Sequence, residues 1–136
     1  MAEPHTLERT DEDILGTIHE LVRSYQPFYA SHRYFHAAVK DGVVILEGHL
    51  RSMRARRLLV QQVGHVEDVV AVDDSRLYDD ETLRFEIGKL LPEGTRVRIS
   101  HGAVVLTGSL PQEVALDELK GRIAEHPGVR DILTDF

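Results

Sequence analysis

The sequence predicts an α+β protein made of two repeats of an α-β-β-α-β unit. Each unit is expected to be a small three-stranded mixed sheet with two helices on one face. When the chain is shifted by sixty residues, 41–76 aligns with 101–136 without a gap. The matched positions are glycines and apolar residues, which a turn geometry and a core require. Within each copy, apolar residues recur first at helical spacing and then at the alternating spacing of strands.

The repeat covers nearly the whole chain. The matched pairs are Gly42 and Gly102, Val44 and Val104, Leu46 and Leu106, Gly48 and Gly108, Leu50 and Leu110, Ala55 and Ala115, Leu59 and Leu119, and Val69 and Val129. Upstream the spacing becomes sixty-nine, so the first copy carries about nine extra residues, placed within 26–34. We therefore expect a tail over 1–10, a first domain over 11–78 and a second domain over 79–136.

The first element of each copy is predicted to be a helix. Thr10 and Asp13 have the spacing of a capping box, and Pro27 is expected to end the helix. Its apolar stripe is Ile14, Ile18, Leu21, Val22 and Tyr25, and the stripe of the second copy is Leu83, Ile87, Leu90 and Leu91. Pro92 and Gly94 are expected to end the second copy's helix.

A β-hairpin is predicted next in each copy. Apolar residues alternate with polar or small ones ahead of two-residue connections, Asp41-Gly42 and His101-Gly102. Glycine suits such a turn because it has no Cβ penalty at positive φ. Gly48 and Gly108 are expected to mark a tight bend where the second strand ends.

A second helix and a short last strand are predicted to complete each copy. The helix is indicated by the i, i+4 rows Ala55, Leu59 and Val63, and Ala115, Leu119 and Ile123. The last strands are expected over 69–73 and 129–133. We expect 75–80 to be a polar linker, too short to let the copies move independently.

This pattern resembles the BON domain, also called the transport-associated domain, of osmotically inducible and nodulation-related bacterial proteins. The residues that carry the resemblance are DGVVILEG at 41–48, GAVVLTG at 102–108, and Pro127-Gly128-Val129 with Ile132. The first copy departs from the family with Glu67-Asp68-Val69, which lacks the usual glycine, and with its extra residues. Because the pattern occurs twice in the same order, the sequence is expected to be a tandem BON protein.

The resemblance implies a binding or attachment role without catalysis. BON domains are regarded as modules that associate with phospholipid surfaces or other ligands, often in periplasmic proteins. The segment 1–13 is polar and acidic and has no export signal, so we expect a cytoplasmic location that leaves peripheral membrane association open. The family's pattern is structural, so it implies no catalytic residues.

Charge, composition and the absence of known motifs argue against several other classes of protein. With 16 basic and 23 acidic residues the net charge is -7, so nucleic acid is not an expected partner. There is no cysteine for disulfides or thiolate chemistry. No apolar run approaches the length of a transmembrane segment. GxSxG, GxGxxG and GxxxxGK motifs are absent, so an enzyme is not expected.

The most localised charge feature is a group of arginines at the start of the first copy's second helix: Arg51, Arg54, Arg56 and Arg57. Beside free helix N–H groups they are candidates to bind a phosphate or lipid head group. The equivalent stretch of the second copy is acidic, so the fold does not require them. The alternative is a solvated helix face whose arginines pair with acids such as Glu47, Glu67 or Asp68.

We expect the histidines and the clustered acids to be surface residues and not metal ligands. His32 and His36 are four apart, but in a segment expected to enter a strand, and no HExxH motif is present. We therefore expect no metal site and no cofactor, with the eight histidines, His5 and His101 among them, scattered over the surface. The acids at 73–74 and 79–81 are expected in a solvated linker and helix cap, since a calcium loop's spacing is missing.

The outward face of the strands carries aliphatic residues where a half-buried sheet usually has polar ones: Val43, Ile45, Ala103 and Val105. We hypothesise that two copies, or two chains as a homodimer, associate through this face. The alternative is ordinary β-branched filler.

Three functions thus stay open. The first is attachment to an anionic phospholipid surface or phosphate-bearing ligand, in a stress-related role. The second is a self-associating structural or regulatory module. The third is a sensor of a small ligand or cation, which needs a pocket between the copies.

Overall fold

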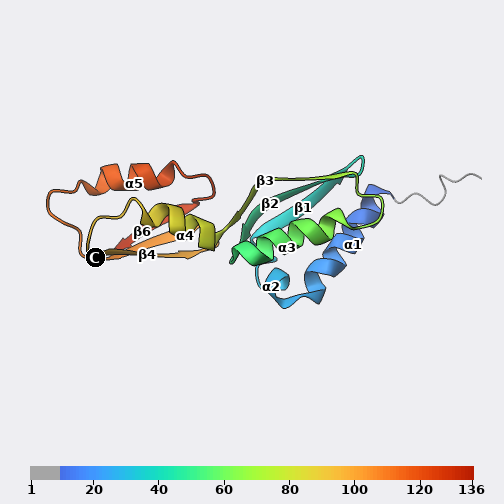
Figure 1. The fold of residues 1–136 in the computed structure, drawn as a ribbon, viewed down its shortest axis with the longest axis horizontal. Coiled ribbons are helices and arrows are strands. Elements are labelled where there is room, and N and C mark those ends of the chain that lie inside the picture. Colours follow the sequence, from blue (N-terminus) through green and yellow to red (C-terminus); the bar gives the residue numbers. More distant parts are fainter. Residues whose placement is uncertain (1–9) are drawn as a thin grey trace, which may run out of the picture.

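The computed structural model describes residues 10–136 and contains the predicted element order twice (Figure 1). The first unit consists of α1 (Asp11–Ser24), α2 (Gln26–Tyr29), β1 (Phe35–Lys40), β2 (Val43–Leu50), α3 (Met53–Gly64) and β3 (Ala71–Asp79). The second consists of α4 (Asp80–Gly88), β4 (Thr95–Ser100), β5 (Ala103–Gly108), α5 (Leu116–Ala124) and β6 (Asp131–Asp135). The expected tail over 1–10, with His5, lies outside the described residues except for its last residue.

Each unit is a three-stranded mixed sheet with its helices on one face, which confirms the predicted fold class. The sheet orders are β1-β2-β3 and β4-β5-β6. In both, the hairpin pair is antiparallel and the last strand runs parallel to the middle one. The two cores are separate, and each combines buried residues of the helices with those of the central strand, such as Leu59 with Leu46 and Ile123 with Leu106.

The helix starts and hairpin turns follow the prediction closely. Thr10 and Asp13 form the predicted capping box. Both residues of each turn have positive φ, 52° and 79° for Asp41 and Gly42, and 48° and 83° for His101 and Gly102. A single helix-start carboxylate binds each turn. Asp11 accepts bonds from both N–H groups of the first turn at 2.8 and 3.0 Å, and Asp80 does the same in the second at 2.7 and 3.0 Å.

Some predicted boundaries are wrong. Gly48 does not end its strand but lies inside β2, at a φ of 121°, where a Cβ would collide with the backbone of Tyr34 and Phe35. Gly108 is the last residue of β5, as expected. Pro27 does not simply end the first helix, because after an extended Tyr25 it opens the short helix α2.

The predicted polar linker is also wrong. Residues 75–79 continue β3, which runs from the first unit directly into α4, with no loop between them (Figure 1). Asp79 is the N-cap of α4, since its side chain accepts a bond from the Thr82 N–H at 2.6 Å. Asp79 and Asp80 are buried instead of solvated, because they bind backbone and arginine groups at this point. The two units therefore follow each other end to end along the long axis of the molecule.

Candidate functional site

The junction between the units is a set of polar and ring contacts around the second hairpin turn. The Ser31 hydroxyl lies 2.8 Å from Nε2 of His101. The Tyr34 ring stacks on the His101 imidazole, with centroids 3.9 Å apart and planes 5° from parallel. His49 donates from Nε2 to the Gly128 carbonyl at 2.6 Å. Ser31 and Tyr34 belong to the extra residues of the first unit, so this segment is part of the junction.

Two histidines that sequence reasoning assigned to the surface are therefore buried. His49 and His101 have exposed fractions of 6% and 7%. Burial lowers the pKa of His101, and the charges of Arg51, His49 and Arg130 lower it further, while Asp80 opposes them. The neutral imidazole is thus favoured in the folded protein.

Two of the four predicted arginines belong to the junction. Arg51 Nε lies 3.3 Å from Asp80 Oδ2, and its Nη1 donates to the Ser100 hydroxyl at 2.9 Å. Arg56 Nε donates to Asp79 Oδ2 at 2.7 Å. These acids differ from the partners that sequence reasoning suggested, which were Glu47, Glu67 and Asp68. Glu47 instead pairs with Arg76 and His36.

The start of α3 already holds an anion. The Ser52 hydroxyl accepts a bond from the Ala55 N–H at 3.0 Å, and Glu81 of the second unit accepts one from the Met53 N–H at 2.9 Å. The expected free N–H groups at this helix end are thus at least partly occupied by a carboxylate of the same chain. An incoming anion would consequently meet arginine side chains more than helix N–H groups.

Arg54 and Arg57 lie on the exposed side of α3, one turn apart. They line a surface hollow of about 490 Å³ together with Met53, Leu58, Gln61 and Glu81. Within residues 10–136 neither forms an ion pair of the kind that Arg51 and Arg56 make. Both guanidinium groups are therefore available to a ligand in solution.

A second hollow of about 480 Å³ lies between the units. Arg51 of the first unit lines it together with Arg84 and Arg98 of the second unit, and Asp80 and Glu81 are also in its lining. Glu81 lines both hollows, so they adjoin. We call the five arginines that line the two hollows, Arg51, Arg54, Arg57, Arg84 and Arg98, the junction arginine cluster.

Local charge at the cluster is positive although the chain is acidic. Five guanidinium groups face two carboxylates, those of Asp80 and Glu81, and both carboxylates already accept bonds from backbone N–H groups. Salt screens more distant charges over about 8 Å at physiological ionic strength. The acids elsewhere in the chain therefore offset this cluster only weakly.

Sequence reasoning missed Arg84 and Arg98. They are distant from α3 in the sequence, and they join Arg51 only because the units dock end to end. Arg98 has a basic neighbour in the sequence, Arg96, but nothing local connects either of them with α3. The contribution of the second unit depends on the tertiary contact.

The sheet face opposite the helices is the second predicted surface. Val43 and Ile45 of β2 and Ala103 and Val105 of β5 are half-buried there. Within the chain the units do not associate through this face, because they meet end to end at the junction (Figure 1). The version of the hypothesis that pairs two copies in one chain is thus wrong, and the version that pairs two chains stays a prediction.

The described residues show neither a metal-binding cluster nor a membrane-spanning helix. No group of three or more histidine, aspartate or glutamate side chains in 10–136 is arranged to hold a metal ion. None of the helices in the same range combines the length and the hydropathy needed to cross a bilayer.

Comparisons with known proteins give a domain and a fold. Residues 33–77, which run from the end of the extra segment through most of β3, match the BON domain. A search of curated proteins returned no match.

Two solved structures have a similar fold over nearly the whole chain. The C-terminal domain of CdsD, the structural protein of the type III secretion system of Chlamydia trachomatis, superposes with a TM-score of 0.75 and 15% identity over 92% of this chain. A second CdsD structure gives a TM-score of 0.72 and 15% identity over 93%. The alignments span only 65% and 62% of the CdsD chains. Residues 33–77 thus match the BON domain, and the chain as a whole shares its fold with the two CdsD structures.

Proposed function

We propose that this protein is an attachment module that binds a phosphate-bearing surface, an anionic phospholipid bilayer in the first place, through the junction arginine cluster. The observation that carries the proposal is the meeting of arginines from both units beside two adjoining hollows. In this proposal the protein is cytoplasmic and binds the membrane peripherally.

Guanidinium chemistry supports a phosphate ligand. Arginine presents a planar fork of donors that matches phosphate oxygens in pairs, and it is more weakly hydrated than lysine. Basic residues near an anionic bilayer contribute about 1 kcal/mol each. On this scale the whole cluster would bind more tightly than Arg54 and Arg57 alone. Met53 and Leu58 add apolar surface to the same hollow.

We further propose that the second unit is also BON-like, with boundaries 11–78 and 79–136 for the two domains. The same strand order and the same helix-start aspartate on the hairpin turn in both units support this proposal. The cluster then spans a tandem pair, and neither domain carries it alone.

Vesicle sedimentation tests the function. The chain should sediment with vesicles of phosphatidylcholine and phosphatidylglycerol at low salt and remain in the supernatant with phosphatidylcholine alone. Arg54→Glu with Arg57→Glu should abolish the sedimentation, since both side chains are exposed and their reversal leaves the core intact. Raising the salt concentration should release the native protein, because screening weakens surface charge interactions.

The matched control is Lys120→Glu with Arg122→Glu on α5, which changes the net charge equally and leaves the cluster unchanged. This control should still bind. Equal loss in both double variants would attribute binding to net charge and contradict the proposal, as would equal binding to neutral vesicles. Adding inorganic phosphate separates the two sources of the ligand, since release by millimolar phosphate favours a free phosphate compound.

The open sheet face favours a second candidate function, self-association. Four aliphatic side chains, Val43, Ile45, Ala103 and Val105, lie on a face that none of the helices in residues 10–136 covers. Burying such a face between two chains would remove about 25 cal/mol of unfavourable hydration free energy for each Å² of apolar surface.

Light scattering coupled to size exclusion tests this candidate. A dimer that becomes a monomer in Val43→Lys with Ile45→Lys supports it, and Val70→Lys is the control, because Val70 is 74% exposed and lies outside that face. An oligomeric state and melting temperature unchanged by the double variant would refute it.

A further inference from the structure

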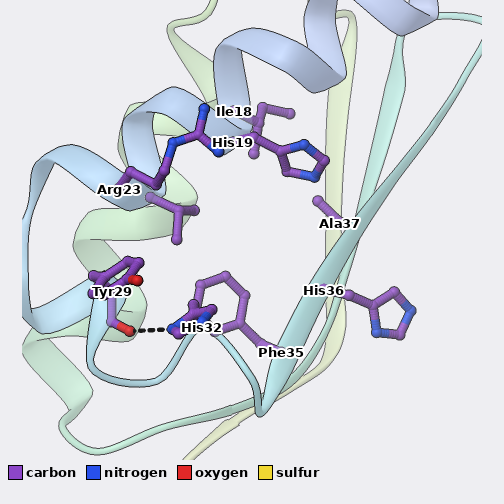
Figure 2. A pocket seen from close by; sticks show the side chains of 9 residues that line it. Ile18, His19, Arg23, Tyr29, His32, Phe35, His36 and Ala37 are labelled. Carbon is purple, nitrogen blue, oxygen red and sulfur yellow. Dashed lines mark hydrogen bonds between the residues drawn. The ribbon is translucent and has the colours of Figure 1, made fainter.

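The first unit has a pocket that lies away from the junction arginine cluster. It measures about 470 Å³ and lies between α1, the extra segment and the start of β1 (Figure 2). Its lining consists of Ile18, His19, Val22, Arg23, Tyr29, His32, Phe35, His36 and Ala37. No acidic residue is among them, although acids outnumber bases in the chain.

The pocket combines an apolar floor with a basic rim. Ile18, Val22 and Phe35 are buried core residues whose edges face the opening. His19 and Arg23 are exposed on α1, one helical turn apart, so both can reach one anionic group. Among residues 10–136, neither makes an ion pair like that of His36 with Glu47 at 3.4 Å. The His36 ring points away from the pocket (Figure 2).

One wall is a fixed planar surface. The rings of Tyr29 and His32 stack with centroids 4.3 Å apart and planes 8° from parallel. His32 donates from Nδ1 to the Tyr29 carbonyl at 2.6 Å, which holds the imidazole in place. Its Nε2 is then the acceptor of the neutral ring and a donor when the ring is protonated. A wall of this kind favours a flat aromatic ligand.

The fold does not require this arrangement, because the second unit lacks it. At the repeat spacing of sixty-nine, His19 corresponds to Gly88 and Arg23 to Pro92. Tyr29 and His32 lie in the extra segment, which has no counterpart there. The apolar positions Ile18 and Ile87, by contrast, match and are buried in both units. The basic rim and planar wall are thus particular to the first unit.

We propose that this pocket binds a small aromatic carboxylate. The ring lies over Ile18, Val22 and Phe35 and beside the planar wall, and the carboxylate is bound by Arg23 and His19. This site is independent of the proposed attachment function, since it shares no residue with the junction arginine cluster. The first unit would then bind a small molecule while the junction binds a surface.

The probe that tests the site is 2-naphthoate, with 2-naphthalenemethanol as the analogue that keeps the ring and removes the charge. The native protein should bind naphthoate at least fivefold more tightly than the alcohol by calorimetry. Amide NMR shifts should change within 18–37. Arg23→Gln should weaken naphthoate binding about fivefold, the effect of one solvent-exposed ion pair, and leave the alcohol unaffected.

Arg33→Gln is the matched control, because Arg33 is exposed in the same extra segment and does not line the pocket. It should bind naphthoate as the native protein does. Equal affinity for the acid and the alcohol, equal weakening by both variants, or shift changes confined to other residues would overturn the proposal. Both variants change exposed residues, so a loss of binding cannot be attributed to unfolding if the dispersion of the amide spectrum is preserved.

Discussion

His101 occupies a position where a positive charge is unfavourable. Its backbone has a φ of 48°, its side chain is 7% exposed, and its ring lies between Tyr34 and the Ser31 hydroxyl. Burial is the main cause of its lowered pKa. In the unfolded chain the same imidazole has its ordinary pKa of 6.5. Just below pH 6.5 the unfolded chain therefore binds more protons at His101 than the folded protein does.

The stability of the protein should depend on pH through His101. Well above pH 6.5 the imidazole is neutral in both states and its contribution to stability is complete. As the pH falls below 6.5, the unfolded chain takes up the proton first, so stability decreases until the lower pKa of the folded state is passed. His101→Asn should reduce this decrease between pH 7.5 and 5.0, since asparagine tolerates positive φ and does not titrate.

Urea unfolding followed by circular dichroism measures the effect at the two pH values. His65→Asn is the control, because His65 is exposed at the end of α3. It should keep the pH dependence of the native protein. If stability falls as steeply with pH in His101→Asn as in the native protein, His101 is not the cause of the pH dependence.

The strand β2 illustrates why a glycine can be required inside an element. At Gly48 the chain has a φ of 121° and passes close to the backbone of Tyr34 and Phe35, where the extra segment enters β1. No other residue type fits both the backbone angle and the space. This glycine therefore fixes how the extra segment, with both its junction and pocket residues, lies against the sheet.

Gly48→Ala should destabilise the protein by more than about 2 kcal/mol, because the new methyl group meets backbone atoms that cannot move aside. Gly16→Ala is the matched control in α1, where nothing lies within 4 Å of the added Cβ. It should stabilise by up to about 1 kcal/mol through helix propensity. Urea denaturation of both variants measures the difference, and equal stabilities would show that the close approach is not strained.

The elements could be predicted wherever the signal is local. Periodicity and turn residues gave α1, both hairpins and the buried row Ala55, Leu59 and Val63. The extension of β3 could not be predicted, because Ser75–Asp79 is too polar for a strand and is stabilised instead by pairing with β2. Asp79 and Asp80 were assigned to solvent for the same reason, since nothing local indicates a buried partner such as Arg56.

The residues of the candidate site also divide into those that the local sequence indicates and those that only the tertiary structure brings together. Arg54 and Arg57 stand out as neighbours in the sequence, whereas Arg84 and Arg98 join them only through docking. The sequence repeat shows that the first unit has about nine extra residues. It does not show that Ser31 contacts the second unit or that Tyr29 lines the pocket, because both depend on the direction in which each side chain points. A repeat locates an insertion without indicating what it contacts.

At the scale of the whole molecule, the two units differ in how well they can stand alone. Among the described residues, the first core has twelve buried apolar side chains and the second has eight. Units of about sixty residues have marginal cores. The contacts of His49, Tyr34 and Arg51 across the junction should therefore stabilise the second unit more than the first.

Differential scanning calorimetry should show one cooperative transition for the native protein. Tyr34→Ala with His49→Ala removes the stacking on His101 and the bond to Gly128, so a second transition at lower temperature should appear, from the second unit. Tyr29→Ala is the control, because Tyr29 is a 45% exposed tyrosine of the same segment whose ring stacks on His32 instead. A single transition in the double variant would mean that the Tyr34 and His49 contacts do not carry the coupling between the units.

The direct passage of β3 into α4 makes the molecule sensitive to chain length as well as to residue type. Inserting one residue into the strand would turn every later side chain of β3 to the opposite face. One residue added at the start of α4 would rotate that helix by about 100°. Either change would separate Arg84 from Arg51 and His101 from its partners, and an insertion ahead of Leu77 would also turn that side chain out of the first core. The number of residues across this point of the chain is therefore fixed by the docking of the two units.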